Sequence, residues 1–216
     1  MKILLIRHAE VAMKWERRYT SREYDEACER YDMADIGPAV RPEDMGDYRR
    51  IYVSTLKRSV QTREYLFPYA SEQMVTQTPL LDEVPLRAYD DSPTLRPRWM
   101  YDLAGRLQWR IGGGSGQPET AAQTKARADA LIDLLEERNE NAILITHGFF
   151  MGVLISRFKK RKRYEVFRGS TFVIRPLEKI RIMDRQPHCG GCHHNCLLKN
   201  AGCVIGQDKA RKEGLL

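Results

Sequence analysis

Arg7 and His8 stand directly after a short apolar run at the start of the chain. A histidine becomes a nucleophile when one ring nitrogen is unprotonated, and neighbouring positive charge favours that state by lowering the imidazole pKa. Guanidinium groups match phosphate oxygens bidentately and neutralise their charge, so a site built from them needs no metal ion. Alone, such a pair is more often a surface feature at a strand end.

The other groups that phosphoryl transfer requires occur in separate segments. Ser54 and Arg58 follow a second apolar run, and His147 follows a third. Glu83 is a carboxyl group that can protonate a leaving group, with Asp82 as a rival donor. Together these residues predict a nucleophile, phosphate-binding cations and a general acid.

Short apolar runs alternate with helical patterns, which indicates the elements that must position these groups. We expect strands at 2–6, 51–53 and 142–146, helices at 57–66, 119–138 and 148–158, and a later strand pair at 170–174 and 179–183. This alternation predicts an α/β fold, a three-layer sandwich whose mostly parallel central sheet is flanked by helices. Ligands of such sheets bind beyond the carboxyl ends of the strands, so the polar groups should meet at one edge.

Four segments, in order along the chain, resemble the motifs of the histidine phosphatase superfamily, also called phosphoglycerate-mutase-like: 5–10, 54–62, 81–83 and 146–148. Residues 119–120 and Arg127 also fit the helix that precedes the last family strand. The resemblance covers about four-fifths of the chain. Several motifs in the family order are far more specific than any one of them.

The resemblance implies that His8 is the nucleophile and forms a phosphohistidine intermediate. It implies that Glu83 acts first as general acid and then as the base that activates water. Arg7 and Arg58 would bind the substrate phosphate, together with Ser54 and the second histidine, His147. No cofactor is expected for this catalysis.

Departures from the family pattern narrow the expected substrate. Thr55 replaces the usual proline, and the run at 9–13 lacks the glycine and asparagine of mutase-type members. The segment that carries Glu83 continues at 84–87 without the glycine-rich pattern of many mutases, so mutase activity is disfavoured. We therefore expect a phosphatase for phosphomonoesters of a small molecule, with a protein phosphohistidine phosphatase as the alternative. An alternative from a different class of function is a metal-binding regulatory or interaction module, whose phosphatase-like domain would only bind phosphate.

The C-terminal residues concentrate four of the five cysteines, namely Cys189, Cys192, Cys196 and Cys203. A thiolate cluster in a segment too small for its own core predicts a structural zinc site, and an iron–sulfur cluster uses the same ligands. The remaining alternative is a disordered, thiol-rich tail. We expect a histidine phosphatase domain at 1–184 and a small Cys-rich tail at 185–216.

The chain carries 36 Lys and Arg against 29 Asp and Glu, a formal charge of +7 that favours anionic partners. The basic run at 159–163 is interpreted as a solvated helix end, and nucleic acid is not an expected partner because interleaved aromatic residues are missing. The first apolar run is too short for a membrane span or a leader, so a cytoplasmic location without membrane contact is expected. Trp15 and the residues at 17–19 are candidates for the pocket wall.

Overall fold

The computed structural model describes residues 1–38, 48–112, 117–162, 164–168 and 172–176. The expected domain boundary after residue 184, the tail at 185–216 and its four cysteines lie outside the described residues. The zinc site therefore stays a prediction from sequence.

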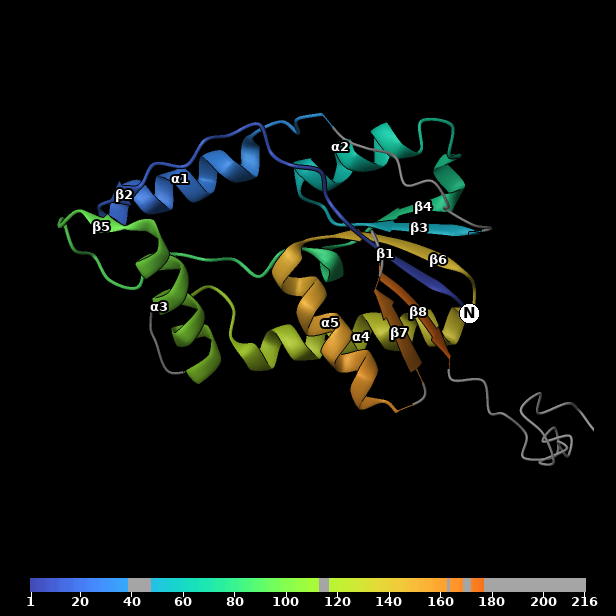
Figure 1. Ribbon diagram of the computed structural model, residues 1–216. Coiled ribbons are helices and arrows are strands. Elements are labelled where there is room, and N and C mark those ends of the chain that lie inside the picture. Colours follow the sequence, from blue (N-terminus) through green and yellow to red (C-terminus); the bar gives the residue numbers. More distant parts are fainter. Residues whose placement is uncertain (39–47, 113–116, 163, 169–171, 177–216) are drawn as a thin grey trace, which may run out of the picture. The chain divides into compact units, whose positions relative to one another are not determined.

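A central sheet organises the described residues, and six strands join in the order β4-β3-β6-β1-β8-β7 (Figure 1). The strands are β1 (Ile3–Arg7), β3 (Arg50–Val53), β4 (Val75–Gln77), β6 (Ala142–Thr146), β7 (Tyr164–Arg168) and β8 (Phe172–Pro176). Strands β4, β3, β6 and β1 pair in parallel, whereas β8 is antiparallel to both β1 and β7. The predicted parallel α/β sheet is confirmed for the first four strands.

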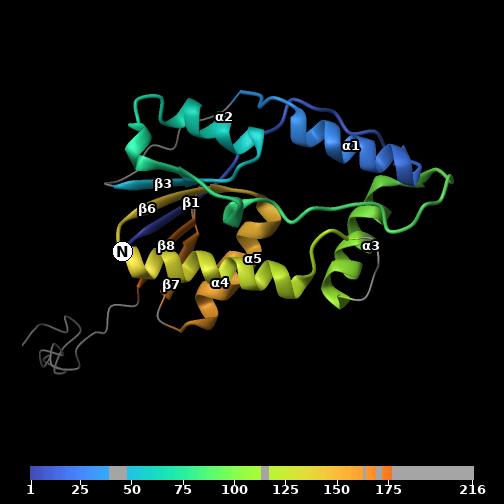
Figure 2. The ribbon, with the colours of Figure 1, turned by 180° about the vertical axis from the view of Figure 1, so that it is seen from behind.

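Helices cover both faces of this sheet (Figures 1 and 2). The helix α2 (Lys57–Leu66) covers one face, and α4 (Ala121–Arg138) and α5 (Gly148–Lys160) cover the other. Two short 3-10 turns, Glu72–Met74 and Pro79–Leu81, flank β4. No helix among the described residues has the length and apolar character needed to cross a membrane.

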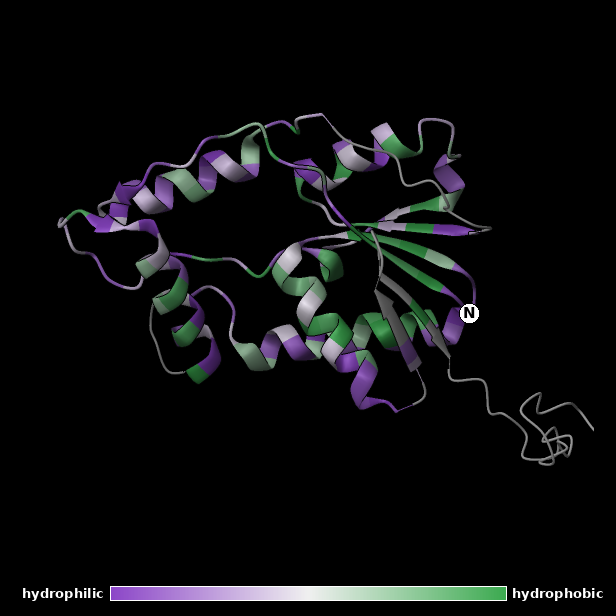
Figure 3. Ribbon diagram, viewed as in Figure 1, coloured by the Kyte–Doolittle hydropathy of each residue, from purple (hydrophilic) through white to green (hydrophobic). Residues whose placement is uncertain are grey.

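Alternate residues of β1 enter different cores, because successive side chains of a strand point to opposite faces. Ile3 and Leu5 pack with the apolar residues of α4 and α5, whereas Leu4 and Ile6 pack with Leu66 of α2. The apolar character of the central strands is visible in Figure 3. The sheet is therefore the middle of three layers, and its buried strands fix the positions of the polar residues that follow them.

Two further helices, α1 (Ser21–Met33) and α3 (Arg98–Ile111), extend beyond the strand ends (Figure 1). Their contact is aromatic, since Tyr24 and Tyr101 stack with ring centroids 4.6 Å apart. A small ribbon joins their ends, where β2 (Arg18–Tyr19) pairs with β5 (Arg96–Pro97). These elements were not among the expected ones, and they form one wall of the candidate site.

The structure differs from the sequence prediction for the last strands. The expected pair was 170–174 with 179–183, but β7 pairs with β8, and 179–183 lies outside the described residues. Lys162, with a φ of 53°, adopts the left-handed conformation and turns the chain sharply at the end of the basic run. The strand β7 thus follows α5 almost directly, without the Gly or Pro residues that usually reveal such a turn.

Candidate active site

Backbone pairing at the strand ends brings three of the predicted site residues together. The His8 N–H donates to the carbonyl of Thr146 at 2.9 Å, and the Ser54 N–H donates to Ile145 at 3.1 Å. The ring centroids of His8 and His147 lie 5.0 Å apart. The ends of β1, β3 and β6 therefore meet at one edge, as the parallel arrangement predicts.

His8 is a buried, neutral imidazole with a defined tautomer. Its Nδ1 lies 2.6 Å from the Ala9 carbonyl oxygen, so Nδ1 carries the proton and Nε2 retains its lone pair. Burial lowers the pKa of His8 to about 4, the bond to Ala9 opposes this shift, and the positive charges of Arg58 and Arg7 add to it. An unprotonated Nε2 at neutral pH is the state that a nucleophilic histidine needs.

His147 has both ring nitrogens engaged inside the protein. Arg58 Nε donates to His147 Nδ1 at 3.1 Å, so the proton is on Nε2, which lies 2.7 Å from Ser54 Oγ. Ser54 Oγ in turn donates to Asp82 Oδ1 at 2.7 Å. Burial, followed by the charge of Arg58, lowers the pKa of His147 to about 2. The chain of bonds holds Arg58 and Asp82 in place from behind the site.

Arg58 is almost completely buried and is shared between that network and α1. Its Nη1 donates to Asp32 Oδ1 at 2.7 Å, and its guanidinium lies 5.0 Å from the centroid of the Tyr31 ring. Asp32 and Tyr31 were missed by the sequence reasoning. The signal for their helix was present at Thr20 and Glu23, which form a capping box at the start of α1.

Arg7 lies beside His8 at the end of β1 and has no hydrogen-bond or ion-pair partner among the described residues. Its guanidinium packs against the first residue of α5, because a Cβ added at Gly148 would lie 3.3 Å from Arg7 Nε. Glycine at this position lets the guanidinium approach the helix N-terminus closely. An unpaired arginine next to the unprotonated His8 is suited to bind an anion.

Glu83 is held at the N-terminus of α5. Its Oε1 accepts from the N–H groups of Val84 and Phe150, both at 2.9 Å, and its Oε2 accepts from Phe149 at 3.1 Å. Arg127 supports the preceding residues, because its Nη1 donates to the carbonyl of Asp82 at 2.7 Å. These bonds fix the carboxylate in one place.

Asp82, the rival acid, is already engaged. Besides Ser54, it accepts bonds from the N–H and the hydroxyl of Thr55, each at 2.7 Å. Thr55 is the residue that replaces the usual proline of the motif, so the replacement provides two of the bonds that hold Asp82. Asp82 and Glu83 thus each accept three hydrogen bonds, and both line the same cavity.

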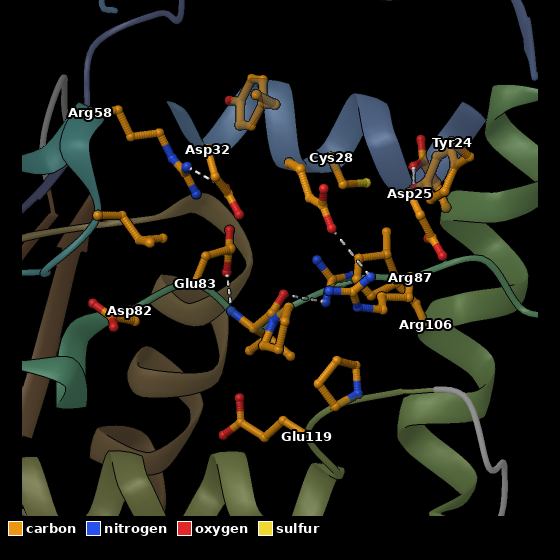
Figure 4. Close-up of a pocket in the computed structure, with 18 of the residues that line it drawn as sticks. Tyr24, Asp25, Cys28, Asp32, Arg58, Asp82, Glu83, Arg87, Arg106 and Glu119 are labelled. Atoms are coloured by element: carbon orange, nitrogen blue, oxygen red, sulfur yellow. Dashed lines mark hydrogen bonds and ion pairs between the residues drawn. The ribbon is translucent and has the colours of Figure 1, made fainter. Parts of the chain in front are cut away.

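These groups open into a cavity of about 710 Å³ between the strand ends, α1 and α3 (Figure 4). Its lining includes Arg7, His8, Trp15, Asp25, Glu29, Tyr31, Asp32, Arg58, Glu83, Arg87, Arg98, Arg106 and Arg127. Ser54 and His147 are fully buried behind it. Of the candidate wall residues near the nucleophile, Trp15 lines the cavity, whereas Tyr19 is buried with the aromatic residues of α1 and α3.

Cys28 also lines this cavity and would be a competing nucleophile if its thiol ionised. Burial raises the pKa of Cys28 to about 12, so the thiol stays protonated at neutral pH. Within the described ranges, no group of three or more His, Cys, Asp or Glu side chains is placed to hold a metal ion.

The site thus holds a histidine that can act as nucleophile, cations that can neutralise phosphoryl oxygens, and carboxyl groups that can move a proton, which are the groups that phosphoryl transfer to a side chain needs. Residues 3–174 match the family model of the histidine phosphatase superfamily, branch 1. The chain therefore belongs to the histidine phosphatase superfamily. The family assignment made from the sequence motifs is confirmed.

The structure is also similar to solved phosphatases. An α-ribazole phosphatase from Shigella flexneri is 18% identical, with 73% of this chain and 79% of that chain covered and a TM-score of 0.45. A phosphoserine phosphatase from Entamoeba histolytica is 18% identical, with 74% and 80% covered and a TM-score of 0.43. A mycobacterial glucosyl-3-phosphoglycerate phosphatase is 17% identical, with 74% and 82% covered and a TM-score of 0.45. No curated protein matches the chain.

Proposed function

We propose that this enzyme hydrolyses phosphomonoesters of a small molecule through a phosphohistidine intermediate on His8. The observation that carries the proposal is the neutral His8, with Nδ1 donating to Ala9, beside the unpaired guanidinium of Arg7 in one cavity. His8 and Arg7 are therefore already in position before a substrate binds, and the Arg7 guanidinium is free to bind it. Preorganisation of this kind lowers the barrier because little rearrangement is needed in the transition state.

In the first step, Arg7 and Arg58 bind the phosphoryl oxygens and His8 Nε2 attacks phosphorus. The bond from phosphorus to the ester oxygen breaks, and the departing alkoxide takes a proton from Glu83. In the second step, Glu83 removes a proton from water and the resulting hydroxide attacks phosphorus. The bond from phosphorus to His8 Nε2 breaks, which releases inorganic phosphate and regenerates the neutral histidine. His147 and Ser54 serve this chemistry by orienting Arg58 from behind.

Enclosure of the reacting groups supports a small substrate over a protein. His8 has only 7% of its surface exposed, and the cavity in front of it is bounded by α1 and α3. A phosphorylated side chain on a folded protein would have to enter between these helices. The cavity volume of about 710 Å³ is in the range of pockets that hold small molecules.

The proposal is tested by trapping the intermediate. After rapid quench with a radiolabelled phosphomonoester, label that is stable in base and labile in acid should appear on the wild-type enzyme and be absent from His8→Ala. The same two proteins are compared for turnover of nitrophenyl phosphate, with circular dichroism to confirm that both are folded. Wild-type turnover by His8→Ala, or label on a serine, would contradict the proposal.

A further inference from the structure

The helix α3 is apolar on two opposite faces, and its apolar residues are visible in Figure 3. Residues four apart share a face of a helix, and a shift by two residues turns the side chain by about 200°. The inner face carries Tyr101, Gly105 and Trp109. The outer face carries four large apolar residues at the same spacing: Trp99, Leu103, Leu107 and Ile111. We refer to these four as the outer stripe.

The inner face of α3 is covered by the rest of the molecule. Tyr101 is fully buried, and the Trp109 ring packs edge-on against Phe149 with centroids 4.9 Å apart. A Cβ added at Gly105 would lie 2.6 Å from Leu86 Cδ1, so the helix is packed as closely as its glycine permits. These contacts fix the rotation of α3 about its own axis. The outer stripe therefore cannot turn inward.

The outer stripe is exposed. The exposed fractions are 62% for Trp99, 63% for Leu103, 55% for Leu107 and 70% for Ile111. Eight large hydrophobic residues are exposed among the described residues, and five of them lie between residues 95 and 111. Single exposed apolar residues are common, but a concentrated patch marks a contact surface. A helix with apolar residues on both faces is normally buried on both.

The area of the outer stripe is sufficient for pairing with an equal surface. Its four side chains expose on the order of 500 Å², since a large apolar side chain presents roughly 150 to 250 Å² when fully exposed. Two such stripes in contact remove about 1,000 Å² from water, which is the lower limit for a specific protein interface. Leu95 precedes the stripe and is also exposed, so it can add to this area.

The charges of α3 favour an antiparallel arrangement of two copies. Three charged residues of the helix line the cavity instead of the outer face: Arg98, Asp102 and Arg106. Arg110 is exposed and has no ion pair among the described residues. In an antiparallel pair centred between Leu103 and Leu107, the two Arg110 residues lie about 15 Å apart along the helix axis, beyond the screening length at physiological salt. A parallel pair would place them side by side.

The same register gives each group on the outer face a suitable neighbour. Leu103 of one copy lies level with Leu107 of the other, and Trp99 lies level with Ile111, because each pair is equally far from the centre. Arg110 comes within one residue of the level of Trp99 of the second copy. An indole ring is the aromatic surface that a guanidinium prefers.

A second copy matches the outer stripe better than the C-terminal residues of the chain do. Residues 177–216 contain no four large apolar residues spaced four apart. A second copy supplies the identical stripe, and a two-fold axis brings the same patch of both copies together. The required partner is therefore already encoded in α3.

We propose that two copies of this chain associate through the outer stripes of α3, antiparallel, with Leu103 of each copy against Leu107 of the other. The inference is independent of the proposed function and goes beyond it. Pairing covers α3 on both faces, so the helix that forms one wall of the cavity is held from both sides. The contact also removes the largest group of exposed apolar residues from water.

The association is measured by analytical ultracentrifugation of the full chain under reducing conditions, between about 1 and 100 µM. We expect the mass of two chains at high concentration, with dissociation on dilution. Leu103→Glu should raise the dimer Kd about tenfold or more, because each dimer would bury two unpaired carboxylates. Tyr65→Glu is the matched control, since Tyr65 is an exposed apolar residue of another helix, α2, and should leave the Kd unchanged. Circular dichroism confirms that the variants are folded.

The register is tested by mixing two variants. Leu107→Lys should also weaken the dimer by itself. A mixture of Leu103→Glu with Leu107→Lys should be more dimeric than either variant alone, because the mixed dimer places one glutamate against one lysine and keeps one contact between leucines.

Three results would each overturn the proposal. The first is a wild-type chain that stays monomeric throughout the concentration range. The second is a dimer that both Leu103→Glu and Leu107→Lys leave intact, since the contact would then involve another surface. The third is a mixture that is no more dimeric than its components, which would exclude the pairing of Leu103 with Leu107.

Discussion

At the scale of single residues, the two neighbouring carboxyl groups at the site have different environments. Asp82 is held by the side chains of Ser54 and Thr55, whereas Glu83 is held only by backbone N–H groups of its own segment and of α5. Substituting Asp82 therefore disturbs the bond network behind Arg58. Substituting Glu83 leaves that network intact, so the two roles can be tested separately.

Glu83→Gln should slow substrates with poor leaving groups far more than substrates with good ones, because an alkoxide needs a proton on departure and a nitrophenolate does not. We expect kcat to fall about 100-fold or more for an alkyl phosphate and less than about tenfold for nitrophenyl phosphate. Steady-state kinetics of both substrates measure the difference. Asp82→Asn is the control and should affect the two substrates alike. The assignment to Glu83 fails if Glu83→Gln also slows both equally, or if Asp82→Asn is the variant that discriminates.

The buried histidines should make the stability of the protein depend on pH. In the unfolded chain a histidine binds a proton below about pH 6.5, whereas folded His8 stays neutral down to about pH 4. Between these values the unfolded state binds more protons, so the free energy of unfolding falls as the pH falls. The contribution is fully present above pH 6.5, and His147, with its pKa lowered to about 2, extends the loss to lower pH.

Urea unfolding between pH 7.5 and pH 4.5 measures this dependence in the wild-type enzyme and in His8→Gln. The variant should lose less stability over that range, with the difference on the order of 2 to 3 kcal/mol. An unchanged pH dependence would show that His8 is not held neutral by the fold.

At the scale of elements, the N-terminus of α5 performs two functions through adjacent residues. The N–H groups of Phe149 and Phe150 donate to the Glu83 carboxylate. Gly148 has no side chain and so leaves room for the Arg7 guanidinium. The same helix contains Gly152, where an added Cβ would meet no atom within 4 Å. These two glycines form a matched pair for testing the close approach.

Gly148→Ala should lower kcat/KM about tenfold or more, because the new methyl group displaces Arg7 from its place beside the phosphoryl group. Gly152→Ala should leave kcat/KM unchanged and raise the free energy of unfolding by about 0.5 to 1 kcal/mol, since glycine weakens a helix interior. Kinetics with nitrophenyl phosphate and thermal unfolding provide the two readouts. Equal kinetics for the two variants would show that Arg7 does not depend on the space left by Gly148.

The sequence predicted well those helices and strands whose bounds are marked by residues within or next to the same segment. The strand β6 and the helix α2 have the expected bounds, and α4 ends at the expected Arg138, where Asn139 adopts a left-handed conformation with a φ of 48°. The helix α1 was missed because its buried residues are few, and its packing partner Tyr101 is distant in the sequence. The contact of Asp32 with Arg58 could not be predicted for the same reason, since nothing local relates the two residues.

At the scale of the whole molecule, the Cys-rich tail is expected to bind metal independently of catalysis. The positive charge needed at the site is supplied by arginines, and the thiolates at Cys189, Cys192, Cys196 and Cys203 form a separate ligand set in the sequence. Elemental analysis of the full chain should find about one zinc per chain, or iron with visible absorbance. A chelator should remove the metal without reducing hydrolysis of nitrophenyl phosphate.

The prediction of a metal site fails if freshly reduced protein contains neither metal and gains no stability from added zinc. Loss of nitrophenyl phosphate hydrolysis on chelation, with the main domain still folded, would instead contradict the separation between the metal and the active site.

The aromatic packing between α1 and α3 has an evolutionary consequence. Tyr19, Tyr24 and Tyr101 belong to a hydrophobic cluster of their own, distinct from the two clusters that pack the faces of the sheet. Substitutions at separate sites affect stability almost independently. Mutations in this third cluster can therefore reshape the cavity wall at little cost to the packing that positions His8. The chain can diverge toward new substrates through α1 and α3 while the strands that carry the reaction stay unchanged.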